Sequence, residues 1–151
     1  MPCLALDTNT VMALWFFEDP ALKALRDLVE NGYVTLISRA DALEELRRVL
    51  AYRQFAIAES KQQQILATYT ERCTAITADA PDASALPTCS DRDDQKFLEI
   101  ARDGKVSHLI TRDKALLKLN RHRLVRPLYR VLTPEAFCRE LGADQDDAAP
   151  R

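Results

Sequence analysis

The sequence predicts an α/β fold, a three-layer sandwich with a central parallel sheet of about five strands and helices on both faces. Short apolar segments rich in β-branched residues alternate along the 151 residues with longer segments of helical period. Such alternation favours a parallel sheet, because each strand needs a crossover to return to the same edge. Right-handed crossovers then place the carboxyl ends of all the strands along one edge.

The composition is that of one folded domain. Hydrophobic residues make up 47% of the chain and charged residues 29%, which excludes a disordered chain. No apolar segment approaches the roughly 18 residues that a membrane span needs, and we see no signal peptide. We therefore expect one domain over residues 1–141, an acidic and disordered tail over 142–151, a cytoplasmic location and no membrane partner.

The first half of the chain begins with a strand that ends abruptly in an acid, at Leu6-Asp7. Thr8 or Asn9 is the expected cap of the helix that follows it, and Ser38 is the expected cap of a later one. After the opening strand we expect helices at 10–17 and 21–30, a strand at 33–37, helices at 40–51 and 54–72, and a strand at 73–77.

The second half continues the alternation after a proline-containing loop at 79–90. A helix over 91–103 is closed by Gly104, and Pro134 suits the first turn of the last helix. The expected elements after the helix at 91–103 are a strand at 108–111, a short helix at 113–119, a strand at 128–132 and a helix at 134–141.

Two of the expected strands end in acids, and two helices bring further acids to the same edge. Asp7 follows the first strand and Asp113 the fourth. Glu45 lies on the flank of its helix's apolar stripe, whereas Glu44 points to solvent, where it could pair with Arg48. Because chemistry collects at the carboxyl ends of parallel strands, these side chains are candidates for a functional site.

Asp94 occupies an unusual position in the middle of the apolar stripe of the helix over 91–103. A carboxylate on an apolar face is costly unless it is paired or binds a cation, so a functional role is favoured. Asp91 and Asp93 lie to either side of the stripe, and for them ordinary charging of a helix N-terminus explains the acids equally well.

Four carboxylates at one edge would repel one another unless cations neutralise them. Oxygen ligands of this kind suit Mg²⁺ or Mn²⁺. Such a site can activate a water and stabilise a phosphate in an in-line displacement, so the chemistry that fits is metal-dependent phosphodiester hydrolysis. A basic segment from residue 112 to 130 is a candidate phosphate-contacting surface, and a solvated loop is the simpler interpretation. Its candidate RNA-binding residues are Arg112, Lys114, Arg121 and Arg123.

Four blocks of the sequence resemble the PIN-domain ribonucleases, in the family's order and over roughly residues 4–137. In the second block of the family an acid directly precedes a leucine, which selects Glu45, although either glutamate of the Glu44-Glu45 pair could be the ligand. The similar blocks are Leu6-Asp7-Thr8-Asn9, Ser38 with Leu43-Glu44-Glu45-Leu46, Asp91-Arg92-Asp93-Asp94-Gln95-Lys96-Phe97-Leu98 with Ala101, and Thr111-Arg112-Asp113-Lys114 with Leu116 and Leu117.

The resemblance implies a site and a biological role. It makes Asn9 and Thr111 residues that orient ligands or waters, and it adds Asp91 as an outer member of the site. The metal-binding and catalytic acids that it implies are Asp7, Glu45, Asp94 and Asp113. The chain is similar to the VapC toxins of bacterial toxin–antitoxin systems, which implies an RNA substrate, a small antitoxin protein as partner and a homodimer.

Three other functions compete with the toxin interpretation. A PIN nuclease can act in RNA maturation or on DNA without an antitoxin, and a degenerate PIN-like module can bind RNA without cutting it. Phosphotransfer proteins are disfavoured. A response regulator needs an aspartate at the end of the third strand, and the expected strand at 73–77 ends without one. A haloacid-dehalogenase phosphatase needs a second aspartate where this chain has Asn9.

Overall fold

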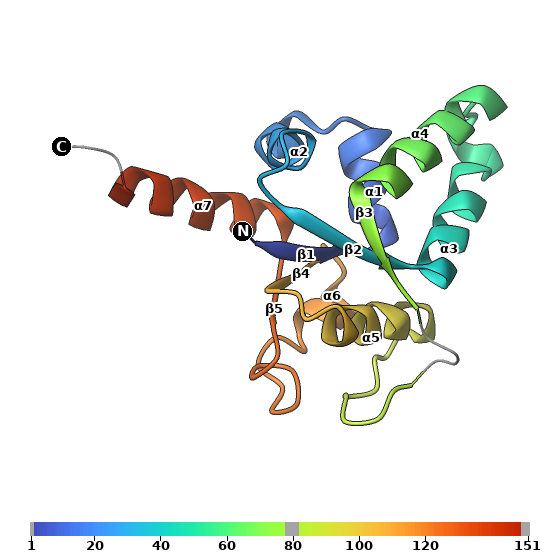
Figure 1. Ribbon diagram of the computed structural model, residues 1–151. Helices are drawn as coiled ribbons and strands as arrows, with labels where there is room; N and C mark the ends of the chain where they lie inside the picture. Colours follow the sequence, from blue (N-terminus) through green and yellow to red (C-terminus); the bar gives the residue numbers. More distant parts are fainter. Residues whose placement is uncertain (1, 78–81, 149–151) are drawn as a thin grey trace.

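A computed structural model describes residues 2–77 and 82–148 of the chain, with side chains up to Gly142 (Figure 1). Five strands form one parallel sheet in the order β3-β2-β1-β4-β5, which confirms the predicted α/β class. The strands are β1 (Cys3–Leu6), β2 (Thr35–Arg39), β3 (Cys73–Ile76), β4 (His108–Ile110) and β5 (Arg130–Leu132).

The strand order places a crevice beside the central strand. From β1 the chain builds the sheet outward through β2 and β3, and it then crosses to the other side of β1 to add β4 and β5. Neighbouring crossovers on the two sides of β1 leave in opposite directions, so the carboxyl ends of β1 and β4 form a topological switch point. In open parallel sheets, ligands bind at such a point.

Helices cover both faces of the sheet (Figure 1). The α-helices are α1 (Thr8–Trp15), α2 (Lys23–Glu30), α3 (Ala40–Leu50), α4 (Glu59–Arg72), α5 (Gln95–Asp103), α6 (Lys114–Leu117) and α7 (Pro134–Ala148). Short 3₁₀ turns precede or follow some of them, namely η1 (Pro20–Leu22), η2 (Arg53–Phe55) and η3 (Arg92–Asp94). Among the described residues, no helix combines the length and the apolar character needed to cross a membrane.

Alternation along the strands divides the core between the two faces. Leu4 and Leu6 of β1 pack with the cluster that includes α1, α2, α4 and α7, whereas Ala5 packs with the cluster that includes α5 and α6. Side chains of successive strand residues point to opposite faces, which explains this division. Strands that are buried on both faces are continuous apolar runs, as the sequence of β1 is.

The structure corrects the two predicted helix caps. Asp7 caps α1 itself, because its Oδ1 accepts the Thr10 N–H at 2.9 Å, and the helix begins at Thr8. Ser38 is not the cap of α3, because β2 continues to Arg39, which pairs with Ile76 of β3 and stands at the N-cap position without a capping side chain.

Most of the other predicted ends of helices and strands differ from the observed ends by one helical turn or less. The helix expected from residue 54 is divided, because Ala56 has a left-handed backbone (φ 48°) between η2 and α4. Helix α7 continues past residue 141 to Ala148. The expected loop at 79–90 lies partly outside the described residues, as do residues 149–151 of the expected tail, and the disorder of that tail stays a prediction.

Candidate metal centre

An open groove of about 260 Å³ lies at the carboxyl ends of β1 and β4. One part of its lining is acidic or polar and consists of Asp7, Thr8, Asn9, Glu45, Asp91, Asp93, Asp94 and Asp113. The other part consists of Val49, Tyr52, Gln54 and Phe55, from the end of α3 and the segment that follows it. The groove therefore holds all four acids that the sequence predicts as a site, together with Asp91.

Asp7 is buried at the end of β1, with 3% of its surface exposed. Its Oδ1 accepts the N–H and the hydroxyl of Thr10, at 2.9 and 2.6 Å, and its Oδ2 accepts the hydroxyl of Thr111 at 2.5 Å. Burial raises the pKa of Asp7, and the hydrogen bonds from Thr10 and Thr111 oppose that rise. The nearby charge of Asp113 adds a smaller upward effect on the Asp7 pKa.

Thr111 connects the ends of the two strands at the switch point. Its hydroxyl donates to Asp7 and accepts the backbone N–H of Asp113 at 2.9 Å. Asp113 in turn caps α6, because its Oδ1 accepts the Ala115 N–H at 2.7 Å. The structure therefore places Thr111 directly behind two of the predicted acids, fully buried and able to fix the position of both.

Asp91, Asp94 and Asp113 form a close group of acids at one end of the groove. One carboxylate oxygen of each lies within 4.8 Å of the others, a spacing that one metal ion could bridge. Asp91 is exposed and caps η3 through the Asp93 N–H at 3.0 Å, whereas Asp94 and Asp113 are half-buried.

Asp94 is the acid of the groove whose side chain most clearly lacks a partner for its charge. Burial, followed by a hydrogen bond with Asp113 and the charges of Asp113, Asp91 and Asp7, raises its pKa to about 7. Its Oδ2 is buried and has no hydrogen-bond partner among the described residues. A buried carboxylate oxygen without a partner, close to other carboxylates, fits a hard divalent cation with oxygen ligands such as Mg²⁺ or Mn²⁺.

Glu45 faces the groove and Glu44 does not. Glu44 forms a salt bridge with Arg47 on the outer surface of α3, at 2.9 Å from Nε to Oε2, and not with Arg48 as expected. Glu45 accepts hydrogen bonds from the Thr8 hydroxyl and from Lys96, whose Nζ lies 3.2 Å from Oε1. It lies outside the tight group of three aspartates and is neutralised in part by Lys96.

Lys96 was missed by the sequence-based prediction, although it follows Asp94 by only two positions. Its Nζ contacts Glu45 of α3 and also donates to the carbonyl oxygen of Asp93. The lysine side chain is 17% exposed, so a positive charge is held against the acidic wall of the groove. The only sequence signal for it was its place within the third motif, beside the acids.

The other predicted residues lie at different distances from the acids. Asn9 is exposed and lines the groove. Arg112 forms ion pairs with acids outside the groove, at 2.9 Å to Asp19 and also to Glu135. Lys114, Arg121 and Arg123 are exposed and do not line the groove, so their contact with RNA stays a prediction.

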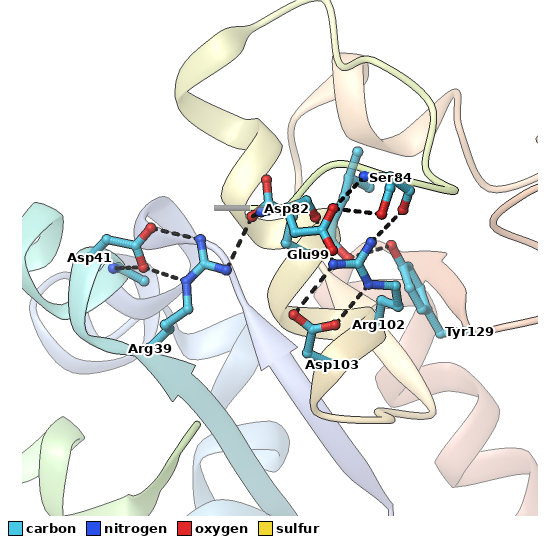
Figure 2. Close-up of polar contacts among 10 residues, drawn as sticks. Arg39, Asp41, Asp82, Ser84, Glu99, Arg102, Asp103 and Tyr129 are labelled. Carbon is cyan, nitrogen blue, oxygen red and sulfur yellow. Dashed lines mark hydrogen bonds and ion pairs between the residues drawn. The ribbon is translucent and has the colours of Figure 1, made fainter. Parts of the chain in front are cut away.

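A buried ion pair holds α5 in place relative to β2 and α3 (Figure 2). Arg39 reaches from the end of β2 to Asp41 at 2.7 Å and to Glu99 of α5 at 3.2 Å. Glu99, which is 3% exposed, also accepts the backbone N–H of Asp82 at 3.1 Å. Figure 2 also shows Arg102 of α5, which donates to the carbonyl oxygens of Asp82 and Ser84. The helices that carry the groove's acids are therefore tied together.

The comparison with protein families finds a match over most of the chain. A family model described as PIN domain matches residues 4–115, which run from Leu4 of β1 past β4 and include every acid of the groove. Among curated proteins, no relative matches the chain at a significant level. The matched segment contains the first three blocks of sequence on which the resemblance depends and, of the fourth, Thr111 to Lys114.

Proposed function

The chain belongs to the PIN-domain family, whose members are generally metal-dependent nucleases, and on this premise we propose that it is an endoribonuclease. It would hydrolyse phosphodiester bonds of RNA with Mg²⁺ or Mn²⁺ held by the carboxylates of the groove. The observation that carries the proposal is the group of Asp91, Asp94 and Asp113, with the unpaired Oδ2 of Asp94 at the sheet's switch point.

The proposed roles follow from the contacts of each side chain. Asp94 and Asp113 would hold the ion with Asp91 at the outer side, and Asp7 would complete the negative charge of the site from β1. A divalent ion bound there supplies an activated water and stabilises charge on the phosphate. Thr111 orients the Asp7 carboxylate by donating to it and holds the backbone of Asp113 by accepting its N–H. Because these groups are held before substrate arrives, little reorganisation is needed during the reaction.

Glu45 lines the acidic part of the groove, and Lys96 of α5 contacts its carboxylate. Lys96 offsets the charge of Glu45, so the groove can accept the negative backbone of RNA beside its own carboxylates. We propose Glu45 as a further acid that would help to hold the metal or act in catalysis. Asn9, which is exposed in the groove, would orient a water or a substrate group there.

The test of the proposed activity is cleavage of labelled single-stranded RNA by the wild type and by Asp7→Asn. We expect cleavage with Mg²⁺ or Mn²⁺, no cleavage in EDTA, and none by Asp7→Asn. Asparagine can still accept the Thr10 N–H that caps α1, so circular dichroism and thermal unfolding should show an intact fold. Asp27→Asn, in an exposed salt bridge of α2, is the matched control and should cleave normally. Full activity of Asp7→Asn would refute the assignment of the site.

We further propose that the protein acts as a toxin that a small antitoxin protein inhibits, as a homodimer located in the cytoplasm. The support is the sequence similarity to VapC toxins. Expression of the wild type should arrest growth, and Asp7→Asn should not. A neighbouring small open reading frame with a DNA-binding segment should relieve the arrest when it is expressed together with the chain. Cleavage of RNA without growth arrest would favour a role in RNA maturation. Cleavage of DNA alone would favour a DNA nuclease, and RNA binding without cleavage would favour a non-catalytic module.

A further inference from the structure

We propose that a cluster of aromatic rings beside the groove, formed by Phe16, Phe17, Tyr52 and Phe55, stacks on the bases of a single-stranded nucleic acid whose backbone enters the groove. This inference rests on the proposed function, because it names the form of the substrate. The cluster plays no part in holding the carboxylates. It is therefore a feature that the proposed metal centre leaves unexplained.

The rings come from two segments that are distant in the sequence. Phe16 and Phe17 follow α1, and Tyr52 and Phe55 follow α3. Phe55 is the centre of the cluster, with ring centroids 5.8 Å from Phe16, 5.8 Å from Phe17 and 6.3 Å from Tyr52. The rings of Tyr52 and Phe55 are close to parallel, at an angle of 12°. The cluster is a packed unit, and its outer members have defined orientations.

Two rings of the cluster are exposed where a folded chain would be expected to bury them. Phe17 is 58% exposed and Tyr52 is 50% exposed, whereas Phe16 and Phe55 pack partly against the core. Two partly buried rings thus support two exposed ones. Aromatic side chains that present a face to solvent on a rigid base are typical of surfaces on which nucleobases stack.

The cluster is continuous with the acidic groove. Tyr52 and Phe55 line the same groove as Asp7, Glu45 and Asp94. A chain whose phosphate lies at the carboxylates therefore passes the rings of Tyr52 and Phe55 with its adjoining nucleotides. Gln54, between the two rings in sequence, also lines the groove and offers an amide that can bond a base edge.

Two arginines near Tyr52 in the sequence favour a nucleic acid over an apolar protein surface as the occupant of the cluster. Arg48 and Arg53 are exposed on either side of Tyr52 in sequence, and neither forms a salt bridge with a described residue. Arginines alternating with aromatic rings suit a ligand that combines phosphates with flat bases. Bases are free to stack on protein only where they are unpaired, so the geometry points to single-stranded substrate.

The experiment measures binding of a short fluorescein-labelled oligouridine by fluorescence anisotropy. Ca²⁺ replaces Mg²⁺ to limit cleavage, and a gel confirms that the RNA stays intact. An abasic chain of the same length and charge is the second probe. The variants are Tyr52→Ala, Phe17→Ala and the conservative Tyr52→Phe. The control is Tyr33→Ala, because Tyr33 is 64% exposed and lies before the start of β2, at the other edge of the sheet.

Loss of one stacking ring should lower the affinity for oligouridine about 5-fold or more. We expect this loss for Tyr52→Ala and Phe17→Ala, with no change in their affinity for the abasic chain. Tyr52→Phe should bind oligouridine with the affinity of the wild type, since it keeps the aromatic ring. Tyr33→Ala should bind both probes as the wild type does.

Each other result overturns the inference in a distinct way. Equal loss for both probes would mean that the substitutions disturb the groove itself. Unchanged RNA affinity with a changed oligomeric state, measured by light scattering, would assign the rings to a protein interface. Unchanged affinity and oligomeric state in both alanine variants would leave the cluster without a binding role. If the wild type binds no RNA, the proposed function fails, and the inference fails with it.

Discussion

Replacing Asp94 by asparagine should stabilise the metal-free protein at neutral and higher pH while abolishing its response to metal. The pKa of the Asp94 carboxyl is raised from 3.8 to about 7, first by burial and then by Asp113, Asp91 and Asp7. Without a cation, the ionised carboxylate opposes folding, because it is partly desolvated and repelled by its neighbours. Asparagine has the same shape and carries no charge, so it removes the repulsion and keeps the packing.

The sign of the pH dependence follows from the raised pKa. Between about pH 4 and pH 7 the folded state of the wild type retains a proton that the unfolded state has lost. Stability is therefore lost as the pH rises through that range, and Asp94→Asn escapes the loss. The unscreened free energy would be about 4 kcal/mol. Because the carboxyl is half-buried and open to solvent screening, we expect about 1 kcal/mol, or about 3 °C in melting temperature.

Thermal and urea unfolding of the two proteins in EDTA, at about pH 5 and about pH 8, measure the difference. The advantage of Asp94→Asn should be larger at the higher pH. Added Mg²⁺ or Mn²⁺ should stabilise the wild type and leave the variant nearly unchanged, because ligand binding to the folded state raises stability. A variant that is less stable than the wild type at pH 8 in EDTA would refute the reasoning, as would a difference that does not depend on pH.

Three further predictions separate the roles of other residues. Glu45→Gln should lower RNA cleavage by at least about 10-fold and Glu44→Gln should leave it unchanged, since only Glu45 lines the groove; the reverse order in a cleavage assay would contradict this. Glu99→Leu should cost about 3 kcal/mol in urea unfolding, because a buried guanidinium keeps only one carboxylate partner; a loss near zero would show that the pair is not stabilising. Charge reversal at Arg121 and Arg123 should weaken RNA binding and flatten its salt dependence, and an unchanged slope would return the segment to a solvated loop.

The fold and the position of the acids were predictable because both depend on local patterns. Apolar runs fix the strands, and parallel strands share a carboxyl edge by geometry, so Asp7 and Asp113 must lie near each other. Helical periodicity then placed Glu45 on the groove side of α3 and Glu44 outside it, as the structure has them. For Asp94, its place on an apolar face predicts pairing or a bound cation, and the structure leaves its buried Oδ2 without a hydrogen-bond partner among the described residues, so the cation stays a prediction.

The contacts that were missed depend on tertiary packing. Glu99 lies between Leu98 and Ile100 on α5, and its burial requires both Arg39 of β2 and the segment that includes Asp82. Neither neighbour is near it in sequence, so no local period marks it. The cap at Ser38 was wrong for a related reason, since pairing with β3 extends β2 by one residue beyond it. Strand ends are decided by the neighbouring strand as well as by the sequence.

The acids of the groove belong to the framework as well as to the site, which explains how a cluster of like charges persists in a folded chain. Asp7 caps α1, Asp91 caps η3 and Asp113 caps α6, each through Oδ1. Each carboxylate therefore meets the positive end of a turn or helix, which lowers the cost of its charge. Asp94 stands at the start of α5 without such a capping bond, and it is the acid whose pKa rises to about 7.

In Asp91 and Asp113 the two carboxylate oxygens have different roles. One oxygen of Asp91 and of Asp113 is committed to the backbone, which fixes the side chain, and the second oxygen is left for the groove. Asp94 has no such commitment, and its buried Oδ2 has no partner among the described residues. A cation would therefore gain most from Asp94, while the capped acids hold their positions whether or not it is bound. The capped acids thus give the groove a fixed shape without an ion, and a metal ion, if bound as we propose, would gain its free ligand oxygen from Asp94.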